Sequence, residues 1–172
     1  MPRIRGYIAS TIDGFIAEAD GSYGFLDPYP AEDADYESFY AGIGTIVMGR
    51  GTYEAVLRHP EWGYRGKRSI VVTSRPLPSL PPDTELWHRG VDALLEELRS
   101  TDRPGDVWIL GGGKLQQAFL DRQAVDRLEI YVVPVILGDG IPLFPGTDVR
   151  QTMRLAEVGR FGEIAQLVYE RP

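Results

Sequence analysis

The sequence predicts an α/β fold in which helices cover both faces of a mostly parallel central sheet and an antiparallel hairpin closes the chain. Three observations predict it. Short β-branched apolar runs alternate with segments whose apolar residues recur at helical spacing. Turn dipeptides of glycine, aspartate and proline separate these segments. Two adjacent strand-like segments, 155–161 and 163–170, end the pattern, so the hairpin is placed there.

Residues Arg3–Ser10 are expected to form the first strand, because Ile4 and Ile8 then share one face and Tyr7 lies on the other. The segment Thr11–Pro30 is rich in turn dipeptides and is expected to be a long loop. A loop of that length in a compact domain is usually functional.

The remaining elements follow from the same two periodicities. A helix is expected over Ala31–Ala41, because Tyr36, Phe39 and Tyr40 form a stripe at i, i+3 and i+4. A second helix is expected over Thr52–Arg58, and two more are centred on the apolar stripes of 91–98 and 115–119. The other expected strands are 45–48, 68–73, 84–88, 106–110 and 128–136.

Composition bounds the class of protein. The chain has 172 residues, 43% of them apolar and 25% charged, which fits a single globular domain over 1–172. A net charge of −7 argues against nucleic acid and anionic membranes as partners, since both need basic surfaces. The sequence has no cysteine and only two histidines, His59 and His88, so no metal site is expected and both histidines are assigned to surface loops. The sequence shows neither an apolar run long enough to span a membrane nor a secretory signal pattern, so a cytoplasmic location is expected.

A first strand-to-helix turn carries Gly49, Arg50 and Thr52. The two glycines at 49 and 51 let the backbone approach a ligand closely, and the start of the next helix presents free N–H groups. This arrangement suits a pyrophosphate. A plain tight turn with an exposed arginine is the alternative.

A second strand end carries Thr73, Ser74 and Arg75. NAD sites usually offer an acidic residue to the ribose hydroxyls, whereas NADP sites offer an arginine to the 2′-phosphate. This strand end has the arginine and no acid. The alternative is a polar loop start without a ligand.

A third turn has three successive glycines, Gly111, Gly112 and Gly113, followed by Lys114, Leu115 and Gln116. Glycines are entropically costly there, so a close approach must require them. The approach of a phosphate to the helix start is one reason, and tight packing of helix on sheet is the other. The pattern is neither a Walker loop nor the Rossmann fingerprint.

Four blocks, in order along the chain, resemble the dihydrofolate-reductase-like superfamily. Within it the chain is most similar to the reductase (C-terminal) domain of the bifunctional riboflavin-biosynthesis deaminase-reductase and to its stand-alone relatives. The blocks are IASTIDGFIA at 8–17, VMGRGTYE at 47–54, VWILGGG at 107–113 and VPVILGDGIPLF at 133–144. The zinc-binding deaminase half needs cysteine ligands and cannot be part of this chain.

The resemblance implies a three-layer dihydrofolate-reductase-like fold that binds NADPH. It implies a first phosphate-binding turn at Gly49, Arg50 and Thr52, a 2′-phosphate site at Thr73, Ser74 and Arg75, and a pyrophosphate turn from Gly111 to Gln116. It also implies that the backbone of Ala9 and Ile16 holds the nicotinamide carboxamide.

Asp13 and Asp33 are the candidate proton donors. Asp13 lies in the block expected near the hydride-transfer pocket, and an ungapped count places Asp33 where dihydrofolate reductases carry their buried acid. Each has a simpler alternative, Asp13 as half of a turn pair with Gly14 and Asp33 as an acid near a helix start.

The expected function is NADPH-dependent reduction of a small heterocyclic substrate of pteridine or pyrimidine type. A true dihydrofolate reductase and a non-catalytic NADP(H)-binding protein are the alternatives. The phenylalanine at 25 stands in a segment, FLDP, that replaces the Pro-Trp pair typical of dihydrofolate reductases. A homodimer formed through the edge strand at 165–169 is expected as well, because exposed strand edges need covering.

Overall fold

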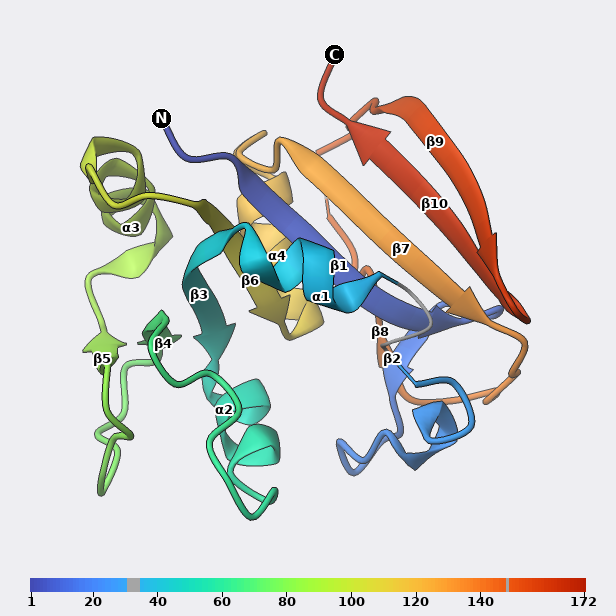
Figure 1. Cartoon of the computed structure of the whole chain (residues 1–172), viewed down its shortest axis with the longest axis horizontal. Helices are drawn as coiled ribbons and strands as arrows, with labels where there is room; N and C mark the ends of the chain where they lie inside the picture. Colours follow the sequence, from blue (N-terminus) through green and yellow to red (C-terminus); the bar gives the residue numbers. More distant parts are fainter. Residues whose placement is uncertain (31–34, 148) are drawn as a thin grey trace.

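The structure is a computed structural model and describes residues 1–172 except 31–34 and 148. Figure 1 shows its central sheet with helices on both faces. The strands are β1 (Ile4–Thr11), β2 (Phe15–Ala17), β3 (Ile43–Gly49), β4 (Arg68–Val72), β5 (Thr84–Trp87), β6 (Asp106–Gly111), β7 (Arg127–Val133), β8 (Ile141–Pro142), β9 (Arg154–Phe161) and β10 (Ile164–Glu170). The helices are α1 (Tyr36–Ala41), α2 (Arg50–Val56), α3 (Gly90–Ser100), α4 (Gly113–Leu120) and the 3-10 helix η1 (Gly24–Leu26).

Eight strands form the main sheet in the order β5-β4-β3-β6-β1-β7-β10-β9. The pairs from β5 to β7 are parallel, and β10 and β9 close the sheet as an antiparallel hairpin. Strands β2 and β8 pair separately in an antiparallel ribbon. The predicted fold class, a mostly parallel sheet with an antiparallel C-terminal hairpin, is confirmed.

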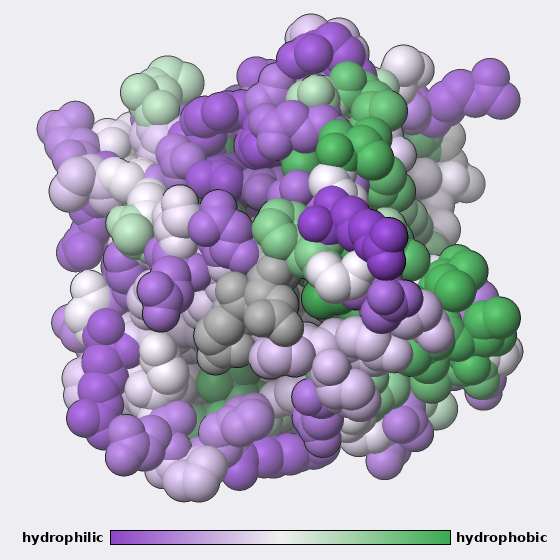
Figure 2. All heavy atoms as spheres, turned by 45° about the vertical axis from the view of Figure 1, so that its right-hand side comes forward, coloured by the Kyte–Doolittle hydropathy of each residue, from purple (hydrophilic) through white to green (hydrophobic). Residues whose placement is uncertain are grey.

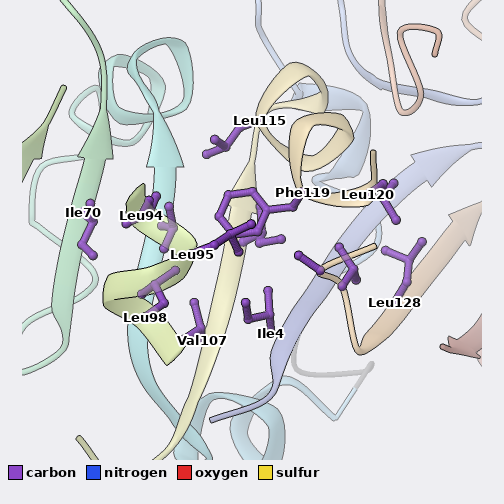
Figure 3. Packing of buried hydrophobic residues seen from close by; sticks show 14 of the residues in the cluster. Ile4, Ile70, Leu94, Leu95, Leu98, Val107, Leu115, Phe119, Leu120 and Leu128 are labelled. Atoms are coloured by element: carbon purple, nitrogen blue, oxygen red, sulfur yellow. The ribbon is translucent and has the colours of Figure 1, made fainter. Parts of the chain in front are cut away.

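One face of the sheet is covered by α3 and α4. Leu94, Leu95 and Leu98 come from α3, and Leu115 and Phe119 from α4. Figure 3 shows these side chains pointing toward the sheet, where they meet apolar residues of β1, β4, β6 and β7. The inward stripes predicted for both helices are confirmed, and burial of this cluster is the main apolar contribution of this layer to folding.

The opposite face is covered by α1 and α2 and is strongly aromatic. Tyr7 stacks on Phe39 of α1 with ring centroids 4.2 Å apart and lies 4.5 Å from the ring of Tyr131. Trp108 meets Phe39 edge-on at 5.1 Å and donates its indole N–H to the Tyr7 carbonyl at 3.2 Å. The predicted division of the first strand is thus confirmed, with Ile4 on the α4 side and Tyr7 on the aromatic side.

A charged cluster interrupts this aromatic face near the amino ends of β1 and β7. The carboxylate of Glu129 is 5% exposed and accepts hydrogen bonds from Arg5 and Arg127. Arg5 also pairs with Asp106 at 3.4 Å, and Arg127 pairs with Glu170 at 3.1 Å. The cluster therefore ties together four strands, β6, β1, β7 and β10.

Most element boundaries lie within one or two residues of expectation, and three of the differences have a structural reason or a consequence for the site. The strand expected over 128–136 ends at Val133, because Pro134 has no N–H to donate and Val135 N turns back to the Val133 carbonyl at 2.8 Å. The helix expected over Thr52–Arg58 spans Arg50–Val56. The helix expected over Ala31–Ala41 begins at Tyr36, because Asp35 before it has a left-handed φ of +55°; residues 31–34 lie outside the described part of the chain.

The long loop expected over Thr11–Pro30 contains two elements that the sequence did not reveal. Strand β2 pairs with β8, and η1 follows it. Both strands are too short for a period-2 pattern to emerge, and their pairing joins segments far apart in the sequence. Among the described residues, no helix is long and apolar enough to cross a membrane.

Glu129 is buried, so removing its negative charge would leave the guanidinium groups around it without a partner and lower the stability of the fold. We expect Glu129→Gln to lower the free energy of unfolding by about 2–3 kcal/mol, because two partly buried guanidinium groups lose their shared anion. Chemical denaturation of both proteins measures this.

The matched control is Glu163→Gln, which removes a charge from a pair with Arg160 in which both side chains are more than 70% exposed. A loss below about 0.5 kcal/mol is expected for an exposed pair. Equal losses in the two variants would contradict a structural role for the buried cluster.

Candidate active site

A gap opens in the main sheet between β1 and β6. These strands pair only from Ile4 to Gly6 on β1 and from Val107 to Ile109 on β6. Beyond Gly6, β1 continues to Thr11 along β7, while β6 continues to Gly111 along β3. The carboxyl halves of the two strands therefore separate at the point where the strand order switches, which is where ligands enter open α/β sheets.

Two of the predicted glycine turns meet beside this gap. Gly49 precedes α2 and Gly112 precedes α4. A Cβ on Gly49 would lie 3.8 Å from the backbone of Gly111 and Gly112, whose peptide bond is cis. The Thr52 hydroxyl would lie 3.4 and 3.5 Å from a Cβ on Gly111 and Gly112. The structure thus brings together two turns that the sequence analysis predicted to bind phosphate and that lie far apart in the sequence.

The third glycine of the run has a packing role. A Cβ on Gly113 would lie 2.5 Å from the Pro142 carbonyl and 3.3 Å from that of Leu143. Side-chain volume is therefore excluded at 113 by the segment that forms β8. Of the two reasons open for this run, tight packing accounts for Gly113, while Gly111 has a φ of +139° that favours glycine for conformation.

The remaining residues of this turn point in different directions. Lys114 is exposed, whereas the side chains of Leu115 and Gln116 are buried under the sheet. Neither amide atom of the Gln116 side chain has a hydrogen-bond partner among the described residues. Only Lys114 among the three presents a side chain to solvent at the helix start.

The end of β4 lies next to the first turn. Arg50 donates to the Pro76 carbonyl at 3.3 Å and forms an ion pair with Glu54 at 2.6 Å. Thr73 accepts from the Arg75 N–H at 3.2 Å, which shapes the loop that follows the strand. The side chains of Ser74 and Arg75 are exposed, so both are open to a ligand. The carboxyl ends of β3, β4 and β6 thus carry the three predicted turns along one edge.

Ala9 and Ile16 lie on the other side of the gap. Ala9 is half-buried in the part of β1 that has separated from β6. Ile16 lies in β2, which the Leu143 N–H fixes through a hydrogen bond to the Gly14 carbonyl at 2.8 Å. Both therefore lie in the segment that leaves the sheet at the gap.

Asp13 anchors the segment after β7. Its carboxylate accepts hydrogen bonds from the Thr11 hydroxyl at 2.6 Å, the Gly138 N–H at 2.7 Å and the Leu137 N–H at 3.2 Å. The Thr11 hydroxyl, followed by these amides, holds the pKa of Asp13 below its ordinary value of 3.8. These contacts favour the ionised carboxylate. Asp33 lies outside the described residues.

A cavity of about 320 Å³ lies between α1 and the β9–β10 hairpin, and we refer to it as the hairpin cavity. Its lining includes Phe39, Tyr131 and Gln166, and its charged members include Arg5 and Glu129. Sequence reasoning missed it. Charged residues inside otherwise apolar strands were the available signal, but their grouping depends on pairing between β1, β7 and β10.

The cavity adjoins the gap through the sheet register. Ala9 on β1 is the partner of Tyr131 on β7, so the ring of Tyr131 lies one strand away from the gap. Burial raises the pKa of Tyr131 and of Tyr7, and it raises the pKa of Tyr36 to about 12. These phenols therefore stay protonated near neutral pH and keep O–H groups that can donate.

Comparison with known proteins places this geometry in a family. The model of the RibD C-terminal domain matches residues 2–167. The chain belongs to the RibD C-terminal domain family. It is 36% identical over 167 residues to the uncharacterized protein YwjB of Bacillus subtilis, covering 96% of this chain and 95% of that protein. It is 30% identical to the riboflavin biosynthesis protein RibD of Corynebacterium ammoniagenes, covering 81% of this chain and 45% of that protein.

Solved structures confirm the dihydrofolate-reductase-like fold. A putative riboflavin biosynthesis protein from Shewanella sp. PV-4 superposes with a TM-score of 0.86 at 23% identity, covering 100% of this chain and 99% of that one. The Thermotoga maritima deaminase/reductase superposes with a TM-score of 0.73 at 20% identity, covering 99% of this chain and 57% of that one. Dihydrofolate reductase from Enterococcus faecalis, complexed with NADP(H) and RAB-propyl, superposes with a TM-score of 0.66 at 20% identity. That match covers 98% of this chain and 96% of the other. These neighbours show the fold, and the family match together with the likeness to RibD supports a reductase-type role for the chain.

The contact between Gly113 and β8 yields a stability prediction. Gly113→Ala should lower the free energy of unfolding by about 1–3 kcal/mol, because its Cβ would overlap a carbonyl oxygen and force the backbone apart. Gly51→Ala in the first turn of α2 is the control, since a Cβ there meets no atom within 4 Å. That variant should be neutral or up to about 1 kcal/mol more stable. Thermal denaturation compares them, and equal effects would contradict the packing role.

The anchoring role of Asp13 yields a prediction about dynamics. In Asp13→Asn the amides of Leu137 and Gly138 should exchange with solvent deuterium several-fold faster, because one of the two acceptor oxygens becomes an NH2 donor and the negative charge is lost. Asp20→Asn, which weakens the similar bond to the Ser22 N–H, should leave those two amides unchanged. Hydrogen exchange followed by NMR reports both sites. Unaltered exchange at 137 and 138 in Asp13→Asn would show that the carboxylate does not hold the segment.

Proposed function

We propose that the chain is an NADPH-dependent reductase that transfers a hydride to a small heterocyclic substrate. The observation that carries this proposal is the gap between β1 and β6, bordered by two glycine turns and followed along the same edge by Arg75. A dinucleotide needs such an extended edge, with phosphate sites at helix starts and a cleft for the reacting ring.

The residues at the edge fit a dinucleotide. A Cβ at Gly49, Gly51 or Gly112 would meet no atom closer than 3.5 Å, so the backbone of both turns leaves room there that suits a pyrophosphate. Ser74 and Arg75 are exposed at the end of β4, and residues 72–76 include no acid, which suits a 2′-phosphate. Lys114 adds a positive charge at the start of α4.

The nicotinamide end would then lie at the gap, with the backbone of Ala9 and Ile16 holding its carboxamide. When bound, the cofactor supplies the hydride, and the protein's part is to orient the two rings and exclude water. The E. faecalis neighbour was solved with NADP(H), and reductase activity is part of the T. maritima protein's name; both support this assignment.

We infer different roles for the two candidate acids. Asp13, held ionised by three hydrogen bonds, positions the segment after β7 and is a poor proton donor. Asp33 stays the candidate proton donor, because its position in the sequence resembles that of the buried acid of dihydrofolate reductases.

The expectation that residues 165–169 form an edge strand is wrong, because β10 pairs with both β7 and β9, and β9 is the edge strand instead. A homodimer through β9 remains part of the proposal. Figure 2 shows hydrophobic surface on the side of the molecule that carries β9, β10 and the segment after β7. Leu155 and Val158 on β9 are 51% and 67% exposed, and Ile136 is 73% exposed. A second copy that covers β9 would bury this surface and the open strand edge. Elution as a monomer in size-exclusion chromatography would contradict it.

Calorimetric titration with NADPH and NADH tests the cofactor assignment. We expect micromolar binding of NADPH and at least tenfold weaker binding of NADH, because about 1.4 kcal/mol of 2′-phosphate contact gives that ratio. Arg75→Ala should remove most of the preference by weakening NADPH alone.

The control is Arg160→Ala, which removes an exposed arginine from the distant β9–β10 turn and should change neither affinity. Absence of binding for both dinucleotides would overturn the proposed function. A preference that survives in Arg75→Ala would overturn the assignment of the 2′-phosphate site.

A further inference from the structure

The hairpin cavity lies one strand away from the gap at which hydride transfer is proposed. Tyr131 lines it and is the register partner of Ala9, so a ring placed at the gap would have this cavity beside it. Phe39 and Phe161 give it aromatic walls from α1 and β9. With a volume of about 320 Å³, it can hold a substituent of a substrate ring rather than a second dinucleotide.

The two arginines of the cavity are already neutralised. Arg5 uses Nε and Nη2 for Glu129 and Nη1 for Asp106. Arg127 donates from Nε to Glu129, and its two other nitrogens donate to Glu157 and Glu170. Every guanidinium nitrogen in the cavity therefore bonds to a carboxylate, and an incoming anion would have to displace one of them.

Among the other polar residues of the lining, the carboxylates only accept hydrogen bonds, whereas Ser38, Tyr131 and Gln166 can both donate and accept. The carboxylates are Asp35, Glu129 and Glu157, against the two guanidinium groups of Arg5 and Arg127, so the lining carries a net charge of −1. Gln166 already donates its Nε2 to the Tyr131 hydroxyl at 2.8 Å, which leaves its carbonyl oxygen as an acceptor. Such a lining matches a partner that brings N–H or O–H donors.

We propose that the hairpin cavity binds an uncharged, donor-rich substituent of the substrate, bearing hydroxyl or amino groups, and that it discriminates against phosphorylated substrates. This rests on the proposed function, because it places the reacting ring at the gap. A phosphate monoester carries a charge of about −1.5 to −2 at neutral pH and would meet a lining of the same sign. The T. maritima neighbour is named as a reductase of a phosphoribosylamino uracil, so the proposal separates this chain's substrate from the one in that name.

The test uses 5-amino-6-(ribosylamino)uracil and its 5-phosphate as a matched pair of probes. Each is titrated into the full chain without cofactor, with tryptophan fluorescence as the signal, since Trp108 packs against Phe39 of the cavity wall. We expect the unphosphorylated compound to bind about tenfold more tightly or better, a difference equivalent to about 1.4 kcal/mol. Equal or tighter binding of the phosphate, or no binding of either compound, would overturn the proposal.

A charge reversal gives the second arm. Glu157→Arg removes a carboxylate that is 59% exposed and frees a nitrogen of Arg127, so folding should be retained. The affinity for the phosphate should rise about tenfold, while that for the unphosphorylated compound changes by no more than about twofold. Glu163→Arg makes the same charge change in the turn of the same hairpin, outside the cavity, and should alter neither. If Glu157→Arg leaves the ratio of the two probe affinities unchanged, the proposed role of the cavity is overturned.

NADPH titration of the same preparations keeps this test separate from that of the proposed function. Normal NADPH binding without discrimination between the probes would contradict the cavity proposal alone. Discrimination between the probes without NADPH binding would contradict the cofactor assignment and leave the cavity as a ligand site of another kind of protein.

Discussion

The site depends on the unequal pairing of β1 with its two neighbours. The strand is hydrogen-bonded to β7 along seven register positions but to β6 along only three. A continuous sheet would have closed the space and left no cleft at its centre. Because the chain instead lets β1 and β6 separate, the glycine turns after β3 and β6 and the Ala9 backbone border one opening, and the hairpin cavity lies one strand away. Helix α4 packs under β1 where the two strands are still paired, with Gln116 Oε1 3.2 Å from the position of a Cβ on Gly6.

Local chemistry explains what the sequence could predict. The turns at Gly49–Thr52, at Thr73–Arg75 and at Gly111–Gly113 each follow a buried parallel strand, and parallel strands bring their carboxyl ends to one edge. Their grouping therefore followed from the fold class alone. The apolar faces of α3 and α4 could also be predicted, because each helix exceeds two turns and has apolar residues at regular helical spacing.

The features that escaped prediction are those set by contacts between distant segments. Strands β2 and β8 are three and two residues long, so neither carries a pattern of its own. The role of Gly113 depends on the carbonyl of Pro142, and the role of Asp13 depends on the amides at 137 and 138. The charged lining of the hairpin cavity could not be predicted for the same reason, since Arg5 and Glu129 become partners only when β1 lies beside β7.

The order of the strands also separates the two kinds of specificity that we propose. Arg75, at the end of β4, and Gln166, on β10, lie on opposite sides of the gap with β3, β6, β1 and β7 between them. Five inter-strand spacings of roughly 4.8 Å put these strands on the order of 24 Å apart, well beyond the range at which substitutions usually interact. The proposed preferences for a dinucleotide and for a substrate substituent thus depend on residues that can change one at a time during evolution. A fold of this kind could acquire new substrates while the residues proposed for the cofactor stay fixed.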